Sequence, residues 1–219
     1  MTKISYASML SALIASAYCV GSASAQNVRW KPEGIAANGT GCQLGENTAL
    51  ILAGDQMQII FWNMGIYLPA NSGLPLAQRK ACTVALGAEI SSGYYAKGIK
   101  QSLRYGGIKS ANASAAIAGQ STFFGLPLKP LTVNLENGTP FNEVSAVVES
   151  EDGFLASDPS PAMWCLAGFN PSGLLTARVV AQGLRDSDAE DLLLSSNMYD
   201  LKYTATMLWD KCPMQAPVE

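Results

Sequence analysis

The C-terminal segment MYDLKYTATMLWDKC, Met198–Cys212, alternates apolar and polar residues more regularly than any other part of this chain. One face would carry the apolar residues Leu201, Tyr203, Ala205, Met207 and Trp209, and the other would carry Lys202, Thr204, Thr206 and Asp210. An alternation with a period of two is typical of a β-strand with one buried face and one exposed face. We therefore expect a strand here, and it ends at a cysteine.

That cysteine is one of four that lie at the edges of strand-like runs: Cys42, Cys82, Cys165 and Cys212. Four cysteines allow three pairings, and we favour the sequential one, Cys42 with Cys82 and Cys165 with Cys212. In the chain-entropy description each bridge would stabilise the fold by about 4 kcal/mol. A redox or metal site is the alternative, but no two cysteines have the C-x-x-C spacing typical of such sites.

The N-terminus has the features of a secretory signal peptide, which we place at residues 1–25. Lys3 precedes the uncharged run Ile4–Val20, and Ala23-Ser24-Ala25 offers the small residues that signal peptidase accepts. The apolar run is shorter than the ~20 residues of a membrane span. Cleavage after Ala25 would remove Cys19 and leave an even number of cysteines in an oxidising compartment. We expect a secreted protein, extracellular or periplasmic, with no membrane span after cleavage.

The composition excludes several partners and chemistries. Charged residues make up 14% of the chain and the net charge is −3, so we expect no binding to nucleic acid or anionic lipid, which require a basic surface. The chain has no histidine, which excludes Ser-His-Asp and Cys-His catalysis and histidine-ligated zinc. We expect no cofactor, and any enzymatic activity would have to rely on carboxylates.

Short alternating runs separated by clusters of Gly, Pro, Asn and Ser recur along the chain. The first two, Thr48–Ala53 and Gln56–Trp62, are separated by Gly54-Asp55 and predict a hairpin. The whole pattern predicts an all-β, disulfide-stapled antiparallel β-sandwich that is jelly-roll-like. We expect one domain over residues 26–219, with an irregular N-terminal lead-in over residues 26–46.

Helix should be rare in this chain, with one or two short helices at most. The best candidate is Asp186–Ser196, where Asp186 or Ser187 would cap a short Ala-Glu-Asp-Leu-Leu-Leu turn. The longer segment Tyr94–Lys109 contains several glycines that disfavour a helix. We expect it to form a strand, a bulge and then a strand.

Five short motifs occur in one order along the chain: Gly39-Thr40-Gly41-Cys42, Arg79-Lys80-x-Cys82, Tyr105-Gly106-Gly107, Trp164-Cys165 and Trp209-x-x-Cys212. This order resembles a family of small secreted cysteine-containing proteins of unknown function from bacteria and fungi. The chain departs from the family pattern at Tyr105, which Arg104 precedes where the family has an Arg after the Tyr, and at Trp164, which adjoins its cysteine directly. The resemblance implies secretion and a β-rich fold, and it supplies no catalytic residues.

Aromatic and basic residues are the candidates for ligand binding. Trp30, Trp62, Tyr67, Tyr94 and Tyr95 would form a sugar-stacking platform if they were exposed together, and the alternative is packing in the core. Lys97, Lys100, Arg104 and Lys109 form one basic stretch, which would meet an acidic polysaccharide or would simply be a solvated strand face. Our candidate binding residues are Trp62, Tyr67, Tyr94, Tyr95, Lys97, Lys100 and Arg104.

The acidic run that begins at Asp186 resembles the start of a calcium loop. The EF-hand template fails there, because its sixth residue is Asp191 where Gly is required and its twelfth is Asn197 where Glu is required. We expect no metal site, and the calcium candidates of low specificity are Asp186, Asp188 and Glu190.

The sequence does not specify a ligand. Our leading hypothesis is a secreted, non-catalytic binding module for a glycan or a cell-envelope component. The first alternative is a structural or interaction protein of the cell surface with a protein partner. The second is a carboxylate-dependent hydrolase, which would need two carboxylates facing each other across a cleft.

Overall fold

The computed structural model describes residues 27–42, 44–62, 64–150, 153, 164–165, 171–195 and 201–213. The predicted signal peptide with Cys19 lies outside the described residues, as do the first three residues of the segment Met198–Cys212. Within the described residues, no helix is long and apolar enough to cross a membrane.

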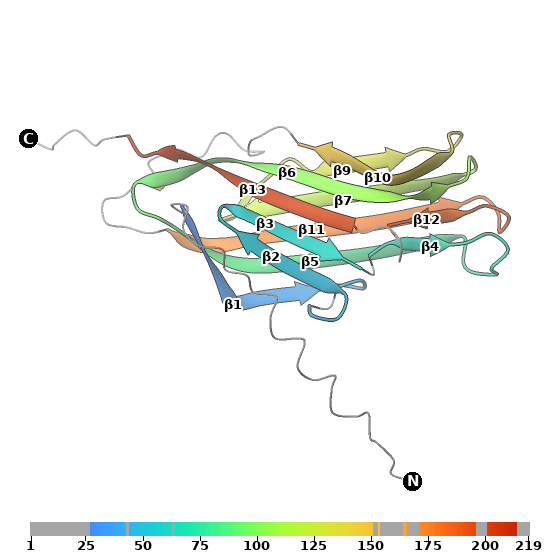
Figure 1. Cartoon of the computed structure of the whole chain (residues 1–219), viewed down its shortest axis with the longest axis horizontal. Helices are drawn as coiled ribbons and strands as arrows, with labels where there is room; N and C mark the ends of the chain where they lie inside the picture. Colours follow the sequence, from blue (N-terminus) through green and yellow to red (C-terminus); the bar gives the residue numbers. More distant parts are fainter. Residues whose placement is uncertain are drawn as a thin grey trace, which may run out of the picture.

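Two antiparallel sheets account for all the strands of the described chain (Figure 1). Sheet A has the order β1-β5-β11-β7-β8, with β9 also paired to β7, and its strands are β1 (Val28–Asn38), β5 (Ala77–Ile90), β7 (Ala113–Phe123), β8 (Leu126–Pro127), β9 (Leu131–Leu135) and β11 (Ser172–Arg185). Sheet B has the order β2-β3-β13-β6-β12-β4, with β10 also paired to β6, and its strands are β2 (Thr48–Ala53), β3 (Gln56–Phe61), β4 (Ile66–Leu68), β6 (Tyr94–Lys109), β10 (Phe141–Glu149), β12 (Leu192–Leu194) and β13 (Leu201–Lys211).

The chain repeatedly crosses from one sheet to the other. It passes from β5 in sheet A to β6 in sheet B and back to β7, and later from β10 in sheet B to β11 in sheet A. Sequential long strands therefore face each other across the core instead of pairing, as in a jelly roll. The all-β, two-sheet sandwich predicted from the sequence is confirmed.

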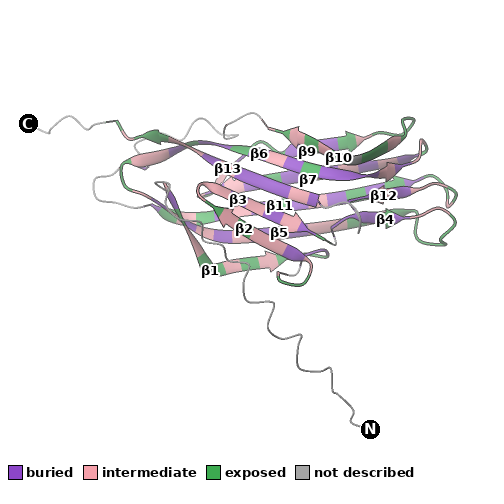
Figure 2. Ribbon diagram, in the orientation of Figure 1, coloured by how far each residue is buried: buried purple, intermediate pink, exposed green. Residues whose placement is uncertain are grey.

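The core lies between the sheets and is built from alternate residues of each long strand (Figure 2). In β13, Leu201, Tyr203, Ala205 and Met207 are buried, as the alternation predicted, while Trp209 is half-buried. The pairing of β13 with β6 shifts register between Leu208 and Trp209, which is the bulge expected within Tyr94–Lys109. That segment is one continuous strand, β6, and not two.

A polar relay crosses the core and joins the two sheets. The Tyr203 hydroxyl, fully buried on β13, donates to Gln101 Oε1 on β6 at 2.5 Å, and it shares a short hydrogen bond with Ser121 Oγ on β7. Gln101 Nε2 in turn donates to the Lys129 carbonyl at 2.8 Å. Burial raises the pKa of Tyr203 well above the ordinary value of a tyrosine. The relay satisfies polar atoms that would otherwise be costly inside the sandwich.

Both predicted disulfides are present. Cys42 pairs with Cys82 on β5, and Cys165 pairs with Cys212 just after β13, with Cα–Cα separations of 5.2 and 5.5 Å. Gly39 explains part of the Gly-Thr-Gly-Cys motif, because a Cβ at that position would lie 2.1 Å from the Ala81 carbonyl oxygen. Glycine lets the chain approach β5 closely beside the first bridge.

The irregular lead-in predicted for residues 26–46 is wrong for most of its length. Strand β1 spans Val28–Asn38 and pairs with β5, and its register shifts between Lys31 and Ala36. Pro32 and Gly34 lie inside that shift, so these two residues interrupt the pairing without ending the strand.

The predicted helix over Asp186–Ser196 is also wrong. The described residues of this segment form a turn and then strand β12, which pairs with β6 and β4. The three leucines Leu192–Leu194 place alternate side chains in the core, so tertiary pairing overrides the local helix signal.

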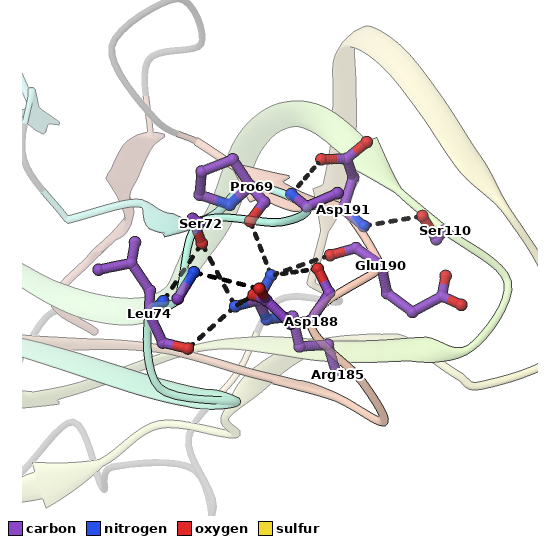
Figure 3. Close-up of polar contacts among 10 residues, drawn as sticks. Pro69, Ser72, Leu74, Ser110, Arg185, Asp188, Glu190 and Asp191 are labelled. Atoms are coloured by element: carbon purple, nitrogen blue, oxygen red, sulfur yellow. Dashed lines mark hydrogen bonds and ion pairs between the residues drawn. The ribbon is translucent and has the colours of Figure 1, made fainter.

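Arg185 fixes this turn (Figure 3). Its side chain has no exposed surface, and it donates to the carbonyls of Pro69, Leu74 and Glu190 at 2.7, 3.0 and 3.2 Å and forms an ion pair with Asp188. These contacts join the loop after β4 to the turn before β12. A guanidinium has enough donors in a fixed fork to hold two loops at once.

Candidate functional site

The structure does not bring the four predicted aromatic binding residues together. Trp62 follows β3 and is 47% exposed, and Tyr67 on β4 is 51% exposed. Tyr94 and Tyr95 begin β6, whereas Tyr67 lies in the cross-strand row that contains Ile108 near the other end of β6. Ile108 is thirteen positions after Tyr95 on β6, which corresponds to about 40 Å of strand. The aromatic residues therefore do not form one platform.

The predicted basic residues share the outer face of sheet B. Lys97, Lys100 and Arg104 are all exposed on β6. Lys100 forms an ion pair with Glu149 at 2.8 Å, and Arg104 Nε donates to Ser145 Oγ at 2.7 Å. On the same face, Gln56 Nε2 donates to Thr206 Oγ1 at 3.2 Å. Many polar groups of this face are thus already bound to one another.

The three calcium candidates serve as acceptors for protein donors. Asp186 accepts from Asn137 Nδ2, and Glu190 accepts from Asn112 Nδ2, both at 3.1 Å. Asp188 binds Arg185 and the Gly73 backbone N–H. Among the described residues, no group of three or more His, Cys, Asp or Glu side chains could hold a metal ion. In this structure the acidic residues connect loops.

A groove of about 660 Å³ lies at one end of the outer face of sheet A. Its lining comes from four adjacent strands, β5, β11, β7 and β9: Ala77, Gln78, Arg79, Ser114, Ala115, Ala116, Asn134, Leu135, Glu136, Gln182, Gly183 and Leu184. This volume is within the ordinary range of small-ligand sites, ~300–1,000 Å³.

The strand register decides which side chains meet in the groove. Gln182 on β11 is opposite Arg79 on β5 and also opposite Ala116 on β7, and Ala116 is opposite Asn134 on β9. These four residues form one cross-strand row of guanidinium, amide, methyl and amide. All four are on the solvent face, because residues that alternate with them, such as Ile117 and Ala181, are buried.

Small residues on β7 form the floor of the groove. The outward positions of β7 carry Ser114 and Ala116, while β11 on one side carries Gln182 and Leu184. On the other side, Asn134 lies on β9 and Glu136 lies just after the end of β9. Strands that flank a central strand are about 10 Å apart. The groove therefore follows β7 between two walls of longer side chains.

Most polar side chains of the groove have no partners within the described part of the chain, although Gln78 Oε1 accepts from the Tyr67 backbone N–H at 2.7 Å. Arg79, Ser114, Asn134, Glu136 and Gln182 form no side-chain hydrogen bond or ion pair with any described residue. This contrasts with the outer face of sheet B, where amides, hydroxyls and charges bind each other. Free donors and acceptors that converge on a concave surface are what a polar ligand requires.

Sequence analysis did not identify the groove. Its residues come from strands that are far apart in sequence, and their alignment depends on the order β5-β11-β7-β9. The run Ser114 to Ala118, with small residues at every position but Ile117, was the one local signal. A row of small residues on a strand face gives a depression only if its neighbours carry longer side chains.

Comparisons with known proteins add little to this site. No protein-family model matches the chain, and no curated protein matches it. Solved structures of carbohydrate-binding modules are similar at low level. TmCBM61, in complex with beta-1,4-galactotriose, has a TM-score of 0.28 and 10% identity and covers 84% of this chain and 86% of its own. A family 11 module from Clostridium thermocellum, in complex with a beta-1,3-1,4-mixed-linked tetrasaccharide, has a TM-score of 0.18 and 11% identity and covers 84% and 87%. At these TM-scores the ligand must be argued from the residues of this chain.

Proposed function

We propose that this protein is a secreted, non-catalytic glycan-binding module and that its binding site is the groove along β7. The observation that carries the proposal is the set of unpartnered polar side chains in that groove. Amide, guanidinium and carboxylate groups provide paired donors and acceptors. Neighbouring hydroxyls of a sugar ring match such pairs, because each hydroxyl both donates and accepts.

The position of the groove supports a glycan over a peptide strand. The floor strand β7 is paired on both sides, with β11 and with β9. Its backbone groups are therefore occupied, and the floor of the groove offers no free strand edge for β-augmentation. Recognition at the floor has to use side chains, and a polyhydroxylated ligand suits them.

The groove also supports binding over hydrolysis. Glu136 is the one carboxylate among its lining residues, whereas glycoside hydrolysis ordinarily needs a pair of carboxylates on either side of the scissile bond. Two disulfides suit the oxidising compartment in which the signal peptide would place the chain.

A glycan array with the purified protein, with and without calcium, tests the proposal. We expect binding to at least one class of glycan, independent of calcium. The double variant Asn134→Ala/Gln182→Ala should weaken that binding at least tenfold, since two hydrogen bonds of about 1 kcal/mol each are lost and 1.4 kcal/mol is a factor of ten.

Gln120→Ala is the matched control. Gln120 is an exposed amide on β7, the floor strand of the groove, and it lies on the same face of sheet A as Asn134 and Gln182. It is opposite Arg178 and two cross-strand rows away from Gln182. Its removal should leave affinity within twofold of the native value. Absence of binding to every glycan, or equal binding of uncharged glycans by the native protein and the groove variant, would contradict the proposal.

A further inference from the structure

Two cations are directly opposite each other on the outer face of sheet B, away from the groove. Lys202 on β13 is the cross-strand partner of Arg104 on β6. Like charges at directly opposed positions destabilise a sheet, so such a pair needs a counter-charge. Among the described residues of this face, the acid Glu149 is opposite Ser102 and forms its ion pair with Lys100 at 2.8 Å.

No described residue supplies that counter-charge. The Lys202 side chain forms no hydrogen bond or ion pair with any described residue, and among those residues the Arg104 side chain binds only Ser145, from Nε to Oγ. The Nη1 and Nη2 groups of Arg104 are left without partners in the described chain. Arg104 and Lys202 lie on β6 and β13, which are adjacent in the middle of the strand order of sheet B.

A β-bulge positions the arginine. The pairing of β10 with β6 shifts register between Glu143 and Ala146, and Ser145 lies inside this shift. The extra residue brings the Ser145 hydroxyl within 2.7 Å of Arg104 Nε. Bulges commonly re-aim side chains beside binding sites. Here the bulge holds one edge of the guanidinium and leaves its fork free for a ligand.

Aliphatic residues flank the pair within its own cross-strand row, whereas the next row carries Ser102, Thr204 and Gln58. The cross-strand row continues from Arg104 to Val147 on β10, which is 58% exposed, and from Lys202 to Ile60 on β3. An aliphatic residue therefore flanks the two cations on each side. A ligand that combines a planar anionic group with a ring bearing C–H groups fits this row.

We infer that Arg104 and Lys202 form an anion site for the carboxylates of an acidic, uronate-containing glycan. The free fork of Arg104 would bind both oxygens of one carboxylate, and Lys202 would add a point charge. The inference shares the ligand class of the proposed function but uses the opposite sheet, so each can fail without the other.

Binding to polygalacturonate, measured by isothermal titration calorimetry at low and physiological salt, tests this site. We expect the native protein to bind and Arg104→Gln/Lys202→Gln to bind at least tenfold more weakly. The control Lys97→Gln/Arg178→Gln also removes one lysine and one arginine charge, but from other exposed positions. It should retain the native affinity within twofold. The groove variant Asn134→Ala/Gln182→Ala should also retain it.

The inference would be overturned if the native protein did not bind polygalacturonate, or if Arg104→Gln/Lys202→Gln bound it as tightly as the native protein. It would also be overturned if Arg104→Gln/Lys202→Gln and Lys97→Gln/Arg178→Gln lost affinity equally, because that would indicate general electrostatic attraction. Two further ligands define the anion. Methyl-esterified polygalacturonate should not bind at this site, because its carboxylates are masked. If dextran sulfate bound more strongly than polygalacturonate, the anion that the site recognises would be a sulfate and not a carboxylate. The free protein provides an independent check, because Lys202→Gln should raise the midpoint of thermal unfolding at low salt while Lys97→Gln should not.

Discussion

The buried hydroxyl of Tyr203 should contribute measurably to stability, and Tyr203→Phe isolates its contribution. The substitution removes one oxygen and leaves the ring in place. It deprives Gln101 Oε1 of its donor at 2.5 Å and Ser121 Oγ of its partner. Both residues are 1% exposed, so water cannot easily replace the lost contacts.

The expected cost follows from those two atoms. An unsatisfied buried polar group costs about 1–3 kcal/mol, and Gln101 keeps the bond from its Nε2 to the Lys129 carbonyl. We therefore expect Tyr203→Phe to lower the free energy of unfolding by about 2 kcal/mol. The small volume change adds little to this figure.

Urea denaturation of the oxidised protein measures this cost. Thr122→Val is a suitable control, because it removes a hydroxyl that binds Thr176 in a partly buried position outside the core relay, and it should cost less. A double-mutant cycle with Ser121→Ala should show a coupling of at least about 0.5 kcal/mol. A loss below about 0.5 kcal/mol for Tyr203→Phe would show that the relay does not stabilise the sandwich.

Three further predictions concern the same fold. Burial raises the pKa of Tyr203, while an unfolded tyrosine ionises near pH 10. Above about pH 10 the folded chain therefore keeps a proton that the unfolded chain loses, and the free energy of unfolding should fall as the pH rises. Denaturation curves of Tyr203→Phe should show a shallower fall across that range. Gly119→Ala would place a Cβ 2.9 Å from Tyr203 Cε2 and should lower the free energy of unfolding by about 1–3 kcal/mol. The control Gly34→Ala has open space around its Cβ and should lower it by less than about 1 kcal/mol. Equal losses in the two variants would argue against close packing at Gly119. Arg185→Lys should lower the free energy of unfolding by about 2–3 kcal/mol and speed proteolysis within residues 69–76, because an ammonium lacks the guanidinium fork; an unchanged cleavage rate would contradict the role of Arg185 in joining the loops.

Local patterns predicted the parts of the fold that depend on one strand or one bond. The alternation in Leu201–Met207 predicted which face of β13 is buried. The sequential cysteine pairing was correct, and the first bridge lies beside the paired strands β1 and β5. The period of two and the cysteine count are properties of the sequence alone.

Parts that depend on tertiary pairing were missed. Asp186–Ser196 has a helix-capping pattern, but the buried Arg185 and the pairing of Leu192–Leu194 with β6 hold its described residues as a turn and a strand. The lead-in was misjudged because Pro32 and Gly34 suggest irregular structure, while strand β1 accommodates them in a register shift.

The site could be predicted less well than the fold. Exposed aromatic and basic residues were chosen by type, yet β6 separates Tyr95 from the row of Tyr67 by most of its length. The groove depends on Gln182 meeting both Arg79 and Ala116, and this meeting requires the order of three strands. No local feature of the sequence determines that order.

The most direct test of the account is to locate the bound glycan. Amide chemical-shift changes should be recorded while the purified protein is titrated with the uncharged glycan that binds most strongly on the array. We predict that the largest changes lie in Ser114–Ala116, Asn134–Glu136 and Gln182–Leu184, the segments that line the groove, and that Asn134→Ala/Gln182→Ala abolishes them. Changes confined to the outer face of sheet B, or to Trp62 and Tyr67, would contradict the assignment of the groove as the binding site.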